Sequence, residues 1–74
     1  MTSEIEKLHM KLRAAVLVHE NLAGDCGRLA RISESEGDTQ AADIILSIAR
    51  FHRVRALEVS SNIDALTALM TRSR

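Results

Sequence analysis

The stretch that decides the fold runs from residue 41 to residue 70 and reads AADIILSIARFHRVRALEVSSNIDALTALM. Apolar residues recur in it at alternating steps of three and four, and one heptad frame collects the positions expected to face a core. These are Ala42, Ile45, Ala49, His52, Ala56, Val59, Ile63, Leu66 and Met70. All of them except the histidine are apolar, and this period over so long a run predicts one continuous amphipathic helix.

A second run with the same period precedes this stretch. Its heptad frame collects Ile5, Leu8, Leu12, Ala15, His19, Leu22, Cys26 and Leu29. Three residues flank this frame on one side and widen it to the breadth of a bundle face, namely Val16, Ala23 and Ala30. Gly24 and Gly27 fall on the outer side of the frame. The sequence thus predicts a second long helix with a leucine-rich core stripe.

A single break separates the two runs, at residues 33–39, which read SESEGDT. Gly37 suits the position that follows a helix C-terminus, and either Asp38 or Thr39 can cap the next helix. A connection this short permits only a tight reversal, so we expect an all-α fold, an antiparallel two-helix hairpin. The expected helices span about residues 3–34 and about residues 38–72.

Length and composition fit one small domain that covers residues 1–74. With no proline and one aromatic residue, the chain lacks the turn chemistry and the aromatic runs of a β-sandwich or barrel. Cys26 is the one cysteine, so no disulfide can staple the chain. The ten basic and ten acidic residues balance, which gives the molecule no bulk attraction to nucleic acid or membranes. Without a long apolar segment or a signal peptide, a soluble cytoplasmic protein is expected.

The two helices carry more apolar surface than a hairpin can cover. The residues in excess are the candidates for a dimer interface: Val16, Leu17, Ile44, Ile48 and Phe51. Monomers rarely expose a patch of this size, and a two-fold homodimer is the simplest cover for it. We therefore expect the hairpin to dimerise into a four-helix bundle, parallel or antiparallel, and to act as a small interaction or regulatory module. The chain holds no nucleophile–base pair or phosphate-binding loop, so neither catalysis nor a cofactor is expected.

Folding the chain about Glu36 pairs residues that lie about equally far from it in sequence. This register places His19 and His52, the only polar residues of the two frames, in one layer at mid-length. In a two-fold dimer four imidazoles would converge there, and neutral imidazole is a ligand for zinc, copper, nickel or iron. One alternative function is therefore a bundle that binds a metal ion or haem through His19 and His52. The same layer also fits a hydrogen-bonded polar layer that sets the register, or a pH-sensitive switch.

Arg50, Arg53 and Arg55 form the one basic cluster of the sequence. Doubled by a dimer, these arginines are candidates for contact with phosphate groups, and the other alternative function is an RNA- or DNA-binding bundle. The balanced total charge and the scarcity of aromatic residues for base stacking argue against it. The sequence leaves open the identity of any further protein partner.

Overall fold

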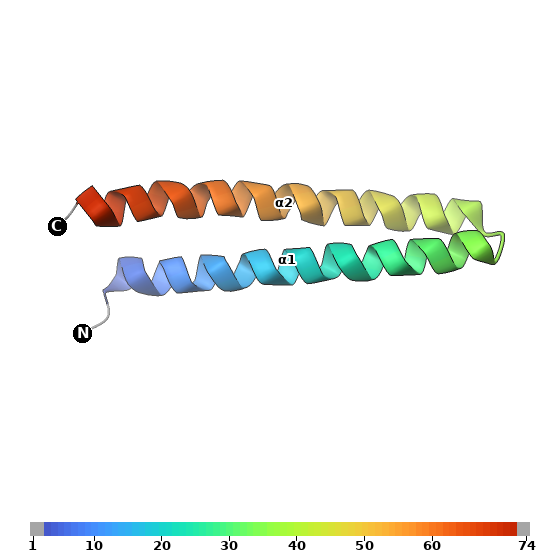
Figure 1. The fold of residues 1–74 in the computed structure, drawn as a ribbon, viewed down its shortest axis with the longest axis horizontal. Coiled ribbons are helices and arrows are strands. Elements are labelled where there is room, and N and C mark those ends of the chain that lie inside the picture. The colour runs from blue at the N-terminus through green and yellow to red at the C-terminus, as the bar shows by residue number, and fades with distance from the viewer. Residues whose placement is uncertain (1–2, 73–74) are drawn as a thin grey trace.

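The computed structural model describes residues 3–72 and consists of two helices, α1 (Glu4–Ser35) and α2 (Thr39–Arg72). The helices lie side by side and antiparallel, with the turn at one end and both chain ends at the other (Figure 1). Their Cα atoms occupy a slab of 57 × 19 × 11 Å. The predicted helical hairpin is confirmed, and each helix boundary falls within one residue of its predicted place.

The turn between the helices is built around Gly37, whose φ of 83° is a left-handed conformation that suits glycine. The Gly37 amide donates to the carbonyl oxygen of Glu34 at 3.0 Å, and the Asp38 amide donates to that of Ser33 at 2.9 Å. These two bonds satisfy the last carbonyl groups of α1 in a Schellman arrangement. Asp38 then caps α2, because its carboxylate accepts from the Ala41 amide at 3.0 Å.

Replacing Gly37 with alanine is expected to lower the free energy of unfolding by about 1 kcal/mol, because alanine must then be held at a positive φ. A steric clash does not contribute to this loss, since an added Cβ at Gly37 would meet no heavy atom within 4 Å. Gly24→Ala is the matched control within α1, where alanine is favoured over glycine by about 1 kcal/mol. Urea denaturation followed by circular dichroism should give shifts of opposite sign, and shifts of the same sign would contradict the role of φ at Gly37.

Small side chains line the seam between the two helices. The buried apolar residues of the described chain are Ala23, Ala30, Ala42, Ala49, Ala56 and Val59, and none of its large side chains is fully buried. Gly27, predicted on the outer side of α1, is buried as well, whereas Gly24 is exposed as predicted. Such small residues let two helices approach closely, and the larger seam residues, such as Ile45 and Leu66, are only half-buried.

The heptad frame predicted for α2 is confirmed. All of its positions, from Ala42 at the start of the helix to Met70 near its end, are buried or half-buried. Ala49 has no exposed surface at all. The periodicity of this stretch therefore identifies the face that α2 turns towards α1.

In α1 one of the two rows of the predicted core stripe is wrong. Leu8, Leu22 and Leu29 are 48, 39 and 53 % exposed. Ala23 and Ala30, predicted as flanking residues, are buried instead. The stripe that faces α2 consists of His9, Leu12, Val16, His19, Ala23, Cys26, Ala30 and Ser33, which are all buried or half-buried. The physical reason is size for Leu22 and Leu29, because the seam admits the small alanine that follows each of them and leaves the leucine at the edge.

Candidate functional site: an apolar face above a histidine pair

The seam positions determine which other side chains share a face of the hairpin. Each residue of an α-helix is turned by about 100° from the one before it, so the residue before a seam residue lies to one side of the seam. When two antiparallel helices pack side by side, the residues that precede the seam positions of one helix lie on the same side of the pair as those that precede the seam positions of the other. Leu22 comes directly before the seam residue Ala23 in α1. Ile48 comes directly before Ala49 in α2, so both side chains lie on one face.

We call this surface the apolar face. Its other members lie three, four or seven residues from Leu22, Leu29 or Ile48, which keeps them on the same side of their helices. The apolar face consists of Val18, Leu22, Leu29 and Ile32 of α1 and Ile44, Ile48 and Phe51 of α2. Each of these side chains is between 39 and 58 % exposed. All of these side chains are large and hydrophobic.

The residues predicted as a dimer interface do not all lie on this face. Ile44, Ile48 and Phe51 belong to it. Val16 is half-buried in the seam. Leu17, which is 60 % exposed, follows a seam residue and therefore lies on the other side of α1. There it borders a shallow hollow together with Met10, Arg13 and Ala14. The α1 members of the apolar face were missed by the sequence prediction, which placed Leu22 and Leu29 inside the hairpin.

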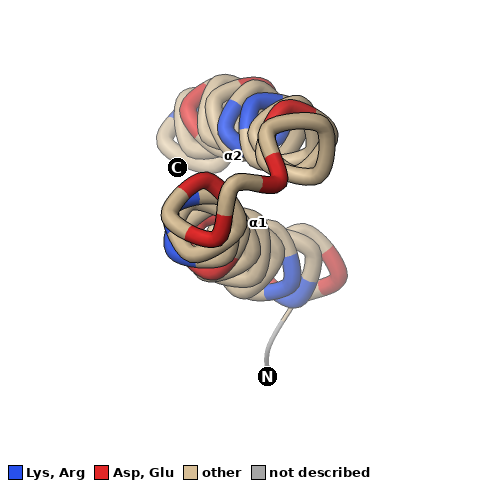
Figure 2. The backbone as a smooth tube through the Cα atoms, turned by 90° about the vertical axis from the view of Figure 1, so that its right-hand side faces the viewer, with Lys and Arg blue, Asp and Glu red and all other residues tan. Residues whose placement is uncertain are grey.

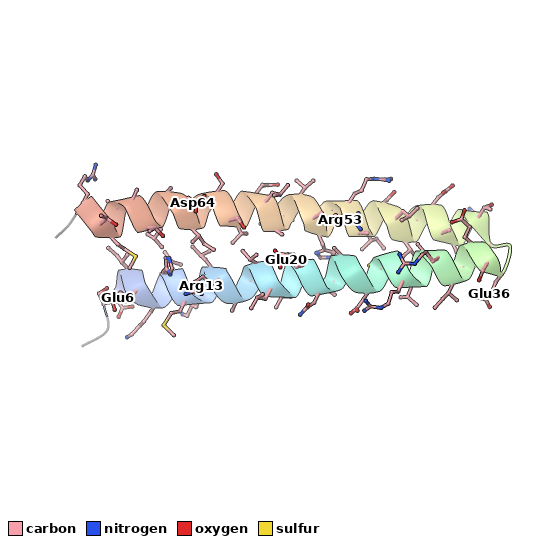
Figure 3. The ribbon with its side chains drawn as sticks, in the orientation of Figure 1. Glu6, Arg13, Glu20, Glu36, Arg53 and Asp64 are labelled. Atoms are coloured by element: carbon pink, nitrogen blue, oxygen red, sulfur yellow. The ribbon has the colours of Figure 1, made fainter. Side chains whose placement is uncertain are left out.

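The opposite face of the hairpin is more polar. It carries a hollow of about 430 Å³ that is lined by Glu20, Ala23, Gly24, Arg53, Ala56, Leu57 and Ser60. Glu20 of α1 and Arg53 of α2, both labelled in Figure 3, border this hollow, and each directly follows a seam histidine. Residues that directly follow a seam position therefore lie on this side of the hairpin. Residues that directly precede one lie on the apolar face, because successive residues of a helix are turned by about 100°.

The histidine layer predicted from the register is confirmed. The Nδ1 atoms of His19 and His52 are 2.9 Å apart and share a hydrogen bond. The two rings are stacked, with centroids 5.1 Å apart and planes inclined by 29°. Such a bond needs one Nδ1 that carries a proton and one that accepts it. His19 and His52 are both half-buried, so the pair is a polar element at mid-length of a mainly apolar seam.

Phe51 connects this histidine pair to the apolar face. The edge of one ring meets the plane of the other in the contact between Phe51 and His52, with centroids 5.1 Å apart and an angle of 79°. Phe51 is itself 58 % exposed. The histidine pair is therefore in contact with the apolar face through the ring of His52.

A single hairpin supplies two imidazoles as metal ligands. Within the described residues, no group of three or more His, Cys, Asp or Glu side chains is placed to hold a metal ion. Cys26 is a free cysteine, half-buried in the seam. A tetrahedral metal site at His19 and His52 would thus need its remaining ligands from a second copy or from solvent.

The three arginines of the basic cluster have different surroundings. Arg50 donates to the Ser47 hydroxyl at 3.3 Å, on its own helix. Arg53 reaches across the seam, where its guanidinium lies close to Gly27. Arg55 forms an ion pair with Glu58 at 3.1 Å. Figure 2 shows both basic and acidic positions on each of the two helices.

Comparisons with models of protein families, with curated proteins and with solved structures found no match to this chain. Between residues 3 and 72, neither helix combines the length and the hydropathy that crossing a membrane requires. The exposed surfaces of the hairpin are thus the features that point to its function.

Proposed function

We propose that this protein is a small interaction module that works as a homodimer of hairpins, a four-helix bundle without catalytic activity. The observation that carries this proposal is the contrast between the small buried side chains of the seam and the large apolar side chains outside it. The buried apolar residues are alanines and one valine, whereas the apolar face exposes leucine, isoleucine, valine and phenylalanine. Burial of apolar surface is the dominant favourable term in folding, so such a hairpin gains stability from a partner that covers this face.

The exposed surface of the chain supports the same proposal. The hairpin exposes 5617 Å². A compact monomer of 8.2 kDa exposes about 4,500 Å². The excess of about 1,100 Å² is larger than the roughly 800 Å² that each partner buries in a stable protein–protein interface. A two-fold homodimer is the commonest way in which soluble proteins cover such a surface.

Sedimentation equilibrium tests this proposal directly, with an expected mass of twice the 8.2 kDa of the chain. Because unfolding then also separates the two copies, the midpoint of thermal unfolding should fall on dilution, by the equivalent of about 1.4 kcal/mol per dimer for each tenfold step. Circular dichroism at a series of protein concentrations measures this shift. A chain that sediments as a monomer, with an unfolding midpoint independent of concentration, would overturn the proposal.

A further inference from the structure

We infer that the second copy docks on the apolar face and that the turn ends of the two hairpins lie together. This inference rests on the proposed homodimer and deepens it by assigning the interface and its orientation. The choice of face follows from the chemistry of the two sides. The apolar face carries the seven large side chains named above. The opposite face carries Glu20 and Arg53 beside its hollow.

The shape of the hairpin suits contact along this face. The slab measures 57 Å in length, 19 Å across the two helices and 11 Å in thickness, so its broad faces lie on either side of the seam. One broad face provides more area than the roughly 800 Å² per partner of a standard interface. Two hairpins stacked face to face form a four-helix bundle in which each helix has two neighbours.

The orientation follows from where the apolar side chains lie along the hairpin. All members of the apolar face come from residues 18–32 and 44–51, next to the turn. By the same rule Asp25, directly before the seam residue Cys26, lies among them, and it forms an ion pair with Arg28. Arg55 and Glu58 lie seven residues after Ile48 and Phe51 and therefore on the same side, nearer the chain ends. There they form an ion pair of 3.1 Å.

Two ways of stacking the hairpins differ in what these charges meet. With the turn ends together, every level of one hairpin faces the same level of the other, so the members of the apolar face meet one another and the Arg55–Glu58 pairs of the two copies meet nearer the chain ends. With full overlap and the turn ends apart, Arg55 and Glu58 of each copy would face the apolar residues of the other. Stacking the apolar members of the two copies on one another buries more apolar surface than stacking them on Arg55 and Glu58, which favours the first arrangement. Because the His19–His52 pair lies near mid-length, both arrangements bring the two pairs to about the same level, and the orientation is decided by the apolar side chains alone.

Ile48→Asp tests the choice of face. A carboxylate at this position would be buried against apolar groups in the dimer, and the dissociation constant is expected to rise more than a hundredfold. Leu57→Asp is the matched control, because Leu57 is 72 % exposed and borders the hollow of the opposite face. Its dissociation constant should equal that of the unchanged protein. If the unchanged protein is a dimer and Leu57→Asp dissociates it while Ile48→Asp does not, the assigned face is wrong and the homodimer itself still stands.

Distance measurement between spin labels tests the orientation. With Cys26 replaced by serine, Glu36→Cys places one label at the exposed turn of each copy. Pulsed electron paramagnetic resonance should then give a separation far below the 57 Å length of the hairpin. Thermal unfolding of the labelled variant at several concentrations checks that it is still a dimer. A separation close to the length of the hairpin would overturn the orientation and leave the face to be judged by the aspartate variants.

Discussion

An Ala49→Leu variant is expected to lose about 1–3 kcal/mol of its free energy of unfolding. Ala49 has no exposed surface and lies in the seam. A leucine there cannot be accommodated by a third element of the hairpin, so the two helices must separate to make room for it. Separation would also stretch the hydrogen bond between His19 and His52, one turn further along α2. Urea denaturation followed by circular dichroism measures the loss.

Ala68→Leu is the control for this substitution. Ala68 lies on the same helix and is exposed, so the same added side chain meets solvent and the free energy of unfolding should change by less than about 0.5 kcal/mol. Equal losses in the two variants would mean that the seam tolerates large side chains. The stability of the hairpin would then not depend on the close approach of α1 and α2.

The contrast between α1 and α2 shows what periodicity predicts and where it is insufficient. In α2 one frame alternates small and larger residues from Ala42 to Val59 and has no competing apolar row beside it on the seam, and the helix turns this frame towards its partner as predicted. In α1 two adjacent rows are both apolar, one of leucines and one of small residues such as Ala23 and Ala30. The period cannot choose between adjacent rows. The choice depends on the width of the seam, which the alanines of both helices set together.

The candidate site was predictable to a similar degree. The shared layer of His19 and His52 follows from the sequence because it depends on the position of the turn, which glycine and aspartate mark clearly. Membership of the apolar face follows only once the rotation of α1 is known. Leu17 illustrates this point, since its side chain lies opposite to that of Ile48 although both are large and exposed. A rotation of one residue about a helix axis thus decides which apolar residues form one surface.

A His52→Leu variant is expected to lose about 1–2 kcal/mol of its free energy of unfolding, whereas replacing both histidines with leucine should restore most of it. In the single variant the Nδ1 of His19 loses its partner at 2.9 Å and remains half-buried. A buried polar group without a partner costs more than the hydrogen bond itself contributes. In the double variant no such group remains, and two apolar side chains fill the layer. The double variant should therefore be more stable than His52→Leu alone.

A double-mutant cycle in urea measures this coupling between the two rings, and His9 provides the reference for it. His9 lies near the start of α1 and its Nε2 pairs with the Thr67 hydroxyl at 3.1 Å, far along the hairpin from His52. The effects of His9→Leu and His52→Leu should therefore add to within about 0.5 kcal/mol. For His19 and His52 the losses of the two single variants should add up to more than the loss of the double variant, by more than about 0.5 kcal/mol, because both single variants break the same hydrogen bond. Additive losses at both pairs would mean that the histidine layer holds the hairpin by packing alone, and that its hydrogen bond does not set the register.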